Sequence, residues 1–400
     1  MTMDYMTVRE AAGKWGISER RVQKYCAQGR IEGSRKFGTA WGIPKTALKP
    51  SDPRKKEPAK DIQNKEKRKG LSYLMPLMNS AFHPGRCMEY IEKMPDPLQK
   101  EIAYAEYFYF SGQAERAFEK SEAMLTSSVM EIRLSASLIH AYASFIMGKI
   151  ERARETLFRI REYLSSEETQ SPDAKAAAGF IFSTASVLLH LPPKGDTVSF
   201  QRTALLLPPG LRLFSVYVQA HALYLQGEYS KSAGMAEAAF MMSSETYPIA
   251  AIYLHLVCVM DYMSLRQTDE ARKHMLAAWE LARPDGFLEP FGEHHGLLGG
   301  MLEAVMKKDW PEEFKQIIAI TYRFSQGWRE IHNPISRREI ADNLTTTEFA
   351  VAMLAARGWT NQEIGEHMNL SPNTVKRHIS SALQKLHINR RQDLKKYMLL

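Results

Sequence analysis

The C-terminal part of the chain contains the stretch NQEIGEHMNLSPNTVKRHISSALQKL, residues 361–386, which predicts two helices separated by a tight corner. Ser371 is a preferred N-cap residue and Pro372 suits the first position of a helix, so the second helix should begin there. Its apolar residues recur at helical spacing, whereas the other side carries hydroxyls, amides and cations without an acid. The stretch therefore predicts a helix with one buried face and one basic, polar face.

Similar helix boundaries extend over residues 344–400 and predict four short helices. Thr345 with Glu348, and Thr360 with Glu363, have the spacing of capping boxes, and Gly358 is placed to end the first helix. The expected helices are 346–357, 361–368, 372–387 and 390–399. The buried stripe of the third should consist of Val375, Ile379, Ala382, Leu383 and Leu386, packed against Phe349, Met353, Leu354, Ile364, Met368 and Leu394.

With these motifs, residues 340–400, called the tail, resemble the LuxR-type (NarL/FixJ-like) helix-turn-helix domain. The resemblance rests on the two capping boxes, Gly358, Ser371 and the segment TVKRHI at 374–379. It implies a four-helix domain whose third helix lies in the major groove of DNA. It also implies a dimer surface on the fourth helix, at Leu394 and Tyr397.

The polar face of the third helix supplies the expected DNA contacts. Short donors near a helix start suit phosphates, and Lys or Arg one turn further on can reach guanine edges. The resemblance implies base contacts by Lys376, Arg377 and Ser380. Thr347 stands where the family commonly has Arg, and Ser380 replaces a frequently longer side chain, so base preference is not transferred. The expected DNA-binding set of the tail is Asn373, Thr374, Lys376, Arg377, Ser380, Ser381 and Lys385.

Residues 1–50, called the head, predict a second small domain. Thr7 and Glu10 form a further capping box, GIS at 16–18 is a corner between two helices, and strand-like alternation surrounds Gly38 and Thr39. The head resembles the excisionase/MerR-like winged helix-turn-helix, although a basic domain that docks on other proteins is an alternative interpretation. The resemblance implies groove contacts by Arg20, Arg21 and Lys24 and wing contacts by Arg35 and Lys36.

Residues 71–335, called the middle, contain a weak internal repeat of helical hairpins. The turn glycines Gly112, Gly148 and Gly227 are followed by Gln267 in the last copy, which gives a period near 36–40 residues. The pattern resembles tetratricopeptide-type repeats and predicts an α-solenoid, with an irregular helical bundle as the alternative. ELARPDGFLEPFGEH at 280–294 is similar to the last repeat of MalT-like regulators.

Charge is unevenly distributed along the 400 residues, whose net charge is +8. The head holds ten Lys or Arg against four Asp or Glu, and residues 51–70 hold eight against four. The tail holds eight against five, which leaves residues 71–339 at −5. Two basic ends on an acidic body favour contact with a polyanion at the ends. Residues 51–70, with Ile62 as their one large aliphatic residue, are interpreted as a basic flexible linker.

Other classes of protein find little support in the sequence. A phosphate-binding loop GxxxxGK[ST] is absent, as are a dinucleotide fingerprint and a GxSxG motif, so we expect no enzyme. Neither a catalytic residue, a cofactor site nor a metal site is expected. Three well-separated cysteines predict neither disulfides nor a zinc cluster and fit a cytoplasmic protein without membrane contact.

The sequence thus predicts a mainly α fold with a winged head, a helical-repeat middle and a LuxR-type tail. We expect a sequence-specific regulator of transcription that binds double-stranded DNA as a homodimer. A small-molecule or protein effector would bind the middle. Phosphorelay control is not expected, because no receiver domain is recognised before the tail. The alternative is a helical-repeat signalling adaptor whose terminal domains mainly bind proteins.

Overall fold

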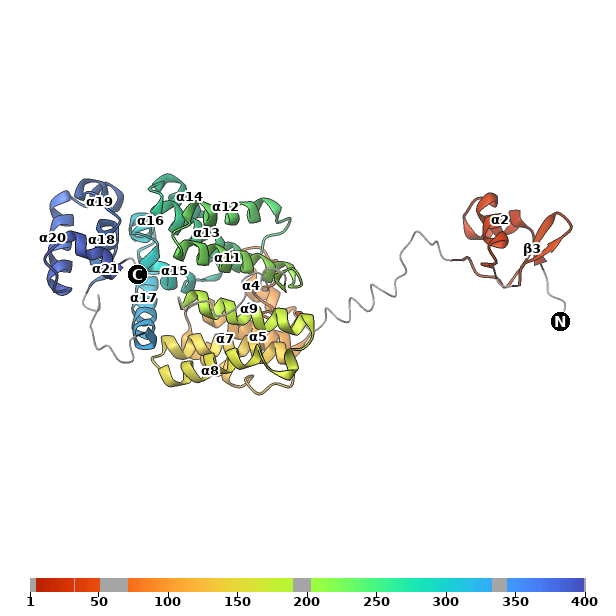
Figure 1. The fold of residues 1–400 in the computed structure, drawn as a ribbon, viewed down its shortest axis with the longest axis horizontal. Coiled ribbons are helices and arrows are strands. Elements are labelled where there is room, and N and C mark those ends of the chain that lie inside the picture. Colours follow the sequence, from red (N-terminus) through yellow and green to blue (C-terminus); the bar gives the residue numbers. More distant parts are fainter. Residues whose placement is uncertain (1–4, 32, 51–70, 190–202, 333–343, 399–400) are drawn as a thin grey trace. The chain divides into compact units, whose positions relative to one another are not determined.

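The computed structural model describes residues 5–31, 33–50, 71–189, 203–332 and 344–398 (Figure 1). The chain divides into two compact units, residues 1–67 and 68–400, so the tail belongs to the same unit as the middle. The predicted linker at 51–70 lies outside the described residues, as do the end of the middle and the start of the tail over 333–343.

The head contains two helices and a small antiparallel sheet. α1 (Val8–Trp15) begins at the expected capping box, where the Thr7 hydroxyl accepts from the Glu10 N–H and the Glu10 carboxylate accepts from the Thr7 N–H. α2 (Glu19–Ala27) follows the turn at Gly16. β1 (Tyr5–Met6), β2 (Arg35–Phe37) and β3 (Ala40–Pro44) form a sheet of order β1-β3-β2.

The expected hairpin around Gly38 and Thr39 is present, since β2 and β3 pair with Phe37 opposite Ala40. The two helices and the sheet enclose a small core that includes Ala11, Val22 and Ile43, each fully buried. This core leaves the outer side of α2 and all of β2 exposed to solvent.

The middle is built from antiparallel helices, with the inner helices more apolar than the outer ones. Its helices are α4 (Cys87–Glu92), α5 (Pro97–Phe110), α6 (Ala114–Glu122), α7 (Met130–Ile146), α8 (Ile150–Tyr163), α9 (Pro172–Leu188), α11 (Pro209–Leu225), α12 (Tyr229–Met242), α13 (Pro248–Ser264), α14 (Thr268–Ala282), α15 (Glu289–His294), α16 (Met301–Asp309) and α17 (Pro311–His332), with 3-10 turns η1 (Glu167–Thr169), η2 (Arg283–Asp285) and η3 (His295–Leu297).

The hairpins α5–α6, α7–α8, α11–α12 and α13–α14 all turn through one residue in the left-handed conformation. This residue is Gly112, Gly148 or Gly227 in three hairpins, with φ between 70° and 79°, and Arg266 in the fourth, with φ 61°. The expected equivalence of Gln267 with these glycines is wrong by one residue. Gln267 is the residue after the turn, and its N–H donates to Tyr262 O at 2.8 Å.

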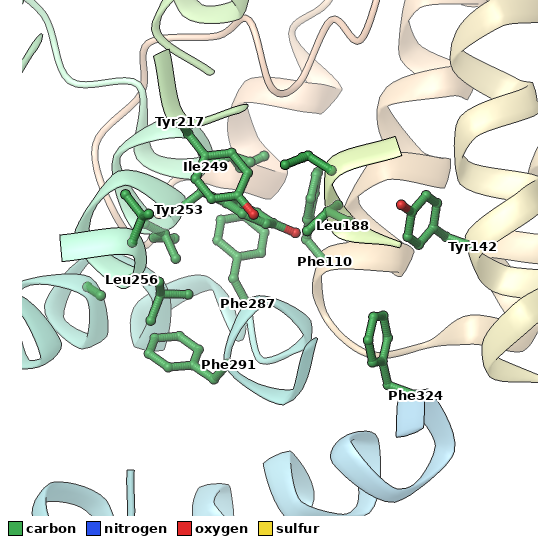
Figure 2. Close-up of a cluster of buried hydrophobic side chains, with 14 of the residues drawn as sticks. Phe110, Tyr142, Leu188, Tyr217, Ile249, Tyr253, Leu256, Phe287, Phe291 and Phe324 are labelled. Atoms are coloured by element: carbon green, nitrogen blue, oxygen red, sulfur yellow. The ribbon is translucent and has the colours of Figure 1, made fainter. Parts of the chain in front are cut away.

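The last helices of the middle pack back onto its first hairpins. α17 contacts α7 and α8, and the ring of Phe324 lies 5.1 Å from that of Phe145. α15 contacts α5, and just before α15 the ring of Phe287 packs against those of Tyr107 and Phe110. Figure 2 shows Phe287 close to Phe110. In an open solenoid each repeat contacts only its neighbours, whereas here long-range aromatic packing closes the array.

The tail has the expected order of helices. α18 (Thr346–Ala356), α19 (Asn361–Met368) and α20 (Pro372–Lys385) begin at the expected caps Thr345, Thr360 and Ser371. α20 ends two residues earlier than expected. The single helix expected at 390–399 is instead a 3-10 turn η4 (Arg391–Leu394) followed by one turn of α-helix, α21 (Lys395–Met398).

Glu106 and Asp261 are among the fully buried carboxyl groups of the middle, and both carry raised pKa values. Burial raises the pKa of Glu106 to about 8, although its carboxylate accepts N–H bonds from Leu77 and Met78. Burial likewise raises the pKa of Asp261 to about 8, against a smaller opposing effect of Ser232. Because the charged form is disfavoured in the folded core, both groups should weaken the fold as the pH rises.

We predict that Asp261→Asn stabilises the chain increasingly as the pH rises from 3.8 towards 8. The folded pKa lies above the unfolded one, so the stability contributed by the wild-type carboxyl is present below 3.8 and is lost as the pH approaches 8. Thermal unfolding of both chains across this pH range measures the difference. The exposed Asp309→Asn is the matched control, and an Asp261→Asn gain that does not grow with pH would contradict the prediction.

Candidate nucleic-acid interface

α20 is positioned in the tail by its cap and its apolar stripe. The Ser371 hydroxyl accepts the Thr374 N–H at 3.0 Å and so satisfies one free donor of the first turn. Val375, Ile379 and Ala382 are buried against α18 and α19. The side of α20 that faces away from these residues is therefore fixed in direction by packing rather than by a loop.

The corner before α20 depends on a close backbone approach. Asn369 adopts the left-handed conformation with φ 54°, and the Leu370 N–H donates to Gly365 O at 2.8 Å. A Cβ atom on Gly365 would lie 2.6 Å from Leu370 O, so a larger residue would push the two helices apart. Arg391 on η4 supports the other end of α19, because it donates to Asn361 Oδ1 and to the carbonyl oxygen of Trp359.

The exposed face of α20 contains most of the predicted DNA contacts. Lys376, Arg377 and Ser380 are exposed, as is Asn373, while Thr374 is half-buried. α20 carries no Asp or Glu. A shallow hollow runs along this face, bordered by Asn373, Lys376, Arg377, Ser380, Ser381 and Gln384.

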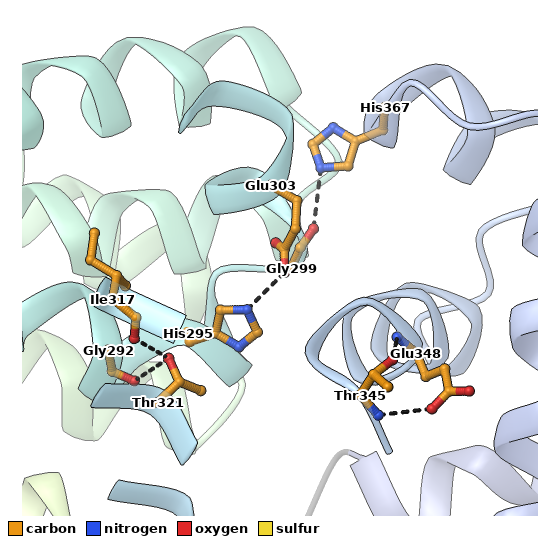
Figure 3. A network of polar contacts seen from close by, with 9 residues as sticks. All are labelled: Gly292, His295, Gly299, Glu303, Ile317, Thr321, Thr345, Glu348 and His367. Atoms are coloured by element: carbon orange, nitrogen blue, oxygen red, sulfur yellow. Dashed lines mark hydrogen bonds and ion pairs between the residues drawn. The ribbon is translucent and has the colours of Figure 1, made fainter. Parts of the chain in front are cut away.

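Two of the predicted contacts are already bound within the tail. The Ser381 hydroxyl donates to Glu348 Oε1 at 2.7 Å, and Lys385 Nζ donates to Glu348 Oε2 at 2.7 Å. Glu348 also accepts the Thr345 N–H as part of the capping box (Figure 3). From the sequence, Glu348 is expected only as part of the cap, since nothing in its spacing shows that a residue 37 positions later pairs with it.

The charge state of Glu348 follows from these contacts. Burial by itself would raise the pKa of this carboxyl, but hydrogen bonds from Lys385, Ser381 and the Thr345 N–H lower the pKa to about 2. Glu348 is therefore an anion that ties the start of α18 to the middle and end of α20. These contacts position α20 relative to α18.

The five predicted residues of the head are all exposed. Arg20, Arg21 and Lys24 lie on α2, and Arg35 and Lys36 lie on β2. The Arg21 guanidinium donates to the Tyr25 hydroxyl at 3.3 Å, which leans its side chain along the helix. The head thus presents cations on both its second helix and its hairpin.

The predicted dimer residues do not form an exposed pair. Leu394 is fully buried, where it contributes to the core of the tail. The side chain of Tyr397 lies outside the described residues. A dimer surface at the C-terminus would have to use residues other than Leu394.

The middle contains a small internal cavity at its aromatic core. Tyr109, Tyr142 and Tyr253 contribute to its wall, together with the buried Thr184, whose hydroxyl has no hydrogen-bond partner among the described residues. The cavity volume is about 20 Å³, which accommodates about one water molecule. In this conformation the cavity is too small for a metabolite.

Within the described ranges, no three His, Cys, Asp or Glu side chains gather closely enough to hold a metal ion. The cysteines Cys26, Cys87 and Cys258 are buried thiols. No helix in the described part of the chain is both long and apolar enough to cross a membrane.

Comparison with known proteins agrees with the geometry of the tail. Residues 342–398 match the luxR family of bacterial regulatory proteins. The tail is thus a LuxR-type helix-turn-helix domain, the DNA-binding domain of transcription regulators.

Two similar curated proteins are response regulators. The response regulator protein VraR of Staphylococcus saprophyticus is 25% identical over 139 residues, which cover 33% of this chain and 66% of that protein. VraR of Staphylococcus epidermidis is 26% identical over 111 residues, which cover 26% of this chain and 53% of that protein. The chain therefore spans about half to two thirds of the length of these relatives. No solved structure matches the chain.

We predict that Glu348→Gln weakens the tail at neutral pH by about 2 kcal/mol, because hydrogen bonds to a charged partner are lost. The folded pKa of about 2 lies below the ordinary 4.5, so this stability is present above 4.5 and is lost as the pH falls towards 2. The loss of stability is measured by urea unfolding, with hydrogen exchange in α18 and α20 as the readout. The exposed Glu366→Gln is the control, and a difference that persists undiminished at pH 3 would contradict the assignment.

Proposed function

We propose that this protein is a sequence-specific transcription regulator that reads duplex DNA with α20. The observation that carries the proposal is the exposed, acid-free face of α20 in a helix-turn-helix whose partner helices are rigidly packed. Lys376 and Arg377 are the side chains best suited to guanine edges, and the shorter Ser380 side chain suits a base edge that lies closer to the helix. Asn373 and Thr374, near the helix start, suit phosphates.

Ser381 and Lys385 have a different role in this proposal. Both are bound to Glu348, so their first contribution is to hold α20 at the correct angle to α18. The Lys385 ammonium has three N–H donors and Glu348 accepts from one of them. The other donors can therefore bind a DNA phosphate while the contact with Glu348 is kept. Replacing either residue should therefore affect the stability of the tail as well as the affinity for DNA.

We propose that the head is a second DNA contact of the winged helix-turn-helix type. Its support is the net charge of residues 1–50 and the exposure of Arg20, Lys24 and Lys36. Two readers on one chain raise apparent affinity through effective concentration without any new contact. The basic segment 51–70 would add attraction to phosphates along the connecting DNA.

The middle is proposed to be a tetratricopeptide-like effector domain. Its repeated hairpin turns support the repeat, while the packing of α17 onto α7 and α8 gives a closed rather than an open array. Because the internal cavity has room for about one water molecule, a protein or peptide on the surface suits this conformation better than a metabolite inside it. A homodimer on DNA, in the cytoplasm, completes the proposal.

We predict that Lys376→Ala together with Arg377→Ala abolishes sequence preference. Each good base contact contributes about 1–3 kcal/mol of discrimination, so the double variant should bind its selected site no better than random duplex. Selection of bound sequences from a random pool, followed by affinity measurement across salt concentrations, tests this. The exposed Lys175→Ala, on α9 of the middle, is the matched control.

The same salt titration distinguishes the regulator from the adaptor. A DNA reader loses affinity steeply as salt rises, because its phosphate contacts release counterions. Wild-type chain that shows no salt-dependent binding to duplex DNA, or a double variant that retains full preference, would favour a helical-repeat adaptor whose terminal domains bind proteins.

We predict that deletion of residues 1–70 lowers the affinity for DNA at least tenfold at low salt and makes its salt dependence shallower. The reason is the loss of the second contact and of the basic segment between the two. Binding isotherms at several salt concentrations measure both effects. Arg20→Ala with Lys24→Ala in the complete chain should reproduce part of the loss, and unchanged affinity and slope in both chains would end the bivalent proposal.

A further inference from the structure

The tail is packed against the end of the middle through α18 and α19. α19 contacts α16, and α18 contacts η3. The buried apolar side chains of the two parts belong to one continuous cluster. Among the described residues, five polar contacts made by Arg266, Arg357 and His367 cross this boundary.

Arg357, the residue at the end of α18, reaches into the middle. Its Nη2 donates to the Tyr224 hydroxyl at 2.7 Å and to Leu297 O at 3.5 Å. A Cβ atom on Gly299 would lie 3.0 Å from Arg357 Nη1, so the glycine leaves the space that this side chain occupies. Tyr224 is itself buried, so the contact takes place away from bulk solvent.

Arg266 contacts the tail from the opposite direction. Its Nη1 lies 3.5 Å from Glu363 Oε1 at the start of α19, and its Nη2 donates to Arg357 O at 3.2 Å. The guanidinium also lies over the ring of Trp359, at 5.9 Å from the centroid. One arginine therefore contacts the end of α18, the connection and the start of α19.

The backbone at Arg266 indicates why an arginine stands here. The equivalent turn position in three other hairpins is glycine, which adopts the left-handed conformation without steric cost. A side chain in this conformation costs about 1–2 kcal/mol. A strained residue that persists at such a position points to a function for its side chain. In this hairpin the function is contact with the tail.

A third contact lies at the turn between η3 and α16. His367 Nε2 lies 3.2 Å from Gly299 O, and because a carbonyl oxygen only accepts, the ring carries its proton on Nε2 (Figure 3). Gly300 packs closely against Met368, whose sulfur would lie 3.3 Å from a Cβ atom there. Beneath the turn, His295 and Glu303 form a buried pair at 2.8 Å, which holds η3 and α16 together.

We propose that α18 and α19 form a permanent docking surface for the α13–α14 turn and the η3–α16 turn, and that the tail reads DNA while it is docked there. The contacts of Arg266, Arg357 and His367 use one side of the tail. Lys376, Arg377 and Ser380 on α20 are exposed although the middle is in place. Docking and DNA reading are therefore compatible.

This proposal rests on the proposed function and adds where the tail lies while it binds DNA. Release of α20 from the middle is not required for DNA binding, because the polar face of α20 is exposed in the docked state.

Hydrogen exchange on the complete chain without DNA tests the docking surface. Arg266→Gly removes the side chain and relieves the left-handed strain, whereas Arg266→Ala removes the side chain and keeps the strain. Because both variants lose the side chain, both should speed hydrogen exchange at least tenfold in α19 and at 296–300. Because only Arg266→Gly relieves the strain, α13 and α14 should exchange more slowly in Arg266→Gly than in Arg266→Ala. Tyr224→Phe, which keeps the ring and removes the acceptor for Arg357, should act in the same direction.

The exposed Arg159→Ala, on α8, is the matched control and should leave both segments unchanged. Unchanged exchange at 296–300 in Arg266→Gly, Arg266→Ala and Tyr224→Phe would overturn the docking surface. Since this arm contains no DNA, its result does not depend on whether the proposed function is correct.

A second arm adds duplex DNA of random sequence at low salt to the wild-type chain. Exchange at 296–300 should stay as slow as in the free chain, while α20 becomes protected. Faster exchange at 296–300 on DNA binding would show that the tail is released before it reads, and would overturn reading in the docked state. Failure of the wild-type chain to bind DNA would refute the proposed function and with it docked reading, whereas the docking surface would still be decided by the first arm.

Discussion

The hairpins of the middle depend on one backbone constraint, a single left-handed residue that reverses the chain between two helices. Glycine meets this constraint at Gly112, Gly148 and Gly227 because it has no Cβ atom. Arg266 meets it at a steric cost in the last hairpin, and its side chain then spans the end of α18 and the start of α19. The same turn therefore shapes the repeat and connects the repeat to the tail.

Buried carboxyl groups in the middle and in the tail have pKa values shifted in opposite directions. In the middle, Glu106 and Asp261 are enclosed by apolar side chains, and their pKa values are raised to about 8. In the tail, Glu348 is also buried, but a cation and two further hydrogen-bond donors surround it and its pKa falls to about 2. Desolvation acts on all three carboxyl groups, and the partners that the fold supplies determine which form is stable.

Much of the tail and the head could be predicted from local sequence, because helix caps and turns are local interactions. The caps at Thr7, Thr345, Thr360 and Ser371 all form hydrogen bonds within three residues. The exposed face of α20 followed from helical spacing in the same way. The last helix was predicted less well, since the 3-10 turn at 391–394 has no strong local signal and Arg391 is held by α19 and the turn before it.

By itself, the sequence determined where helices begin, which face of each is apolar, and that the chain has a basic head and a basic tail, because these properties depend on neighbours within a few residues. Tertiary structure alone decided that Leu394 is internal, that Glu348 binds Ser381 and Lys385, that α17 closes the middle, and that Arg266 and Arg357 join the middle to the tail. The hydrogen-bonded partners among these contacts are separated by 33 to 133 residues. Spacing along a chain carries no information about such pairs until packing brings them together.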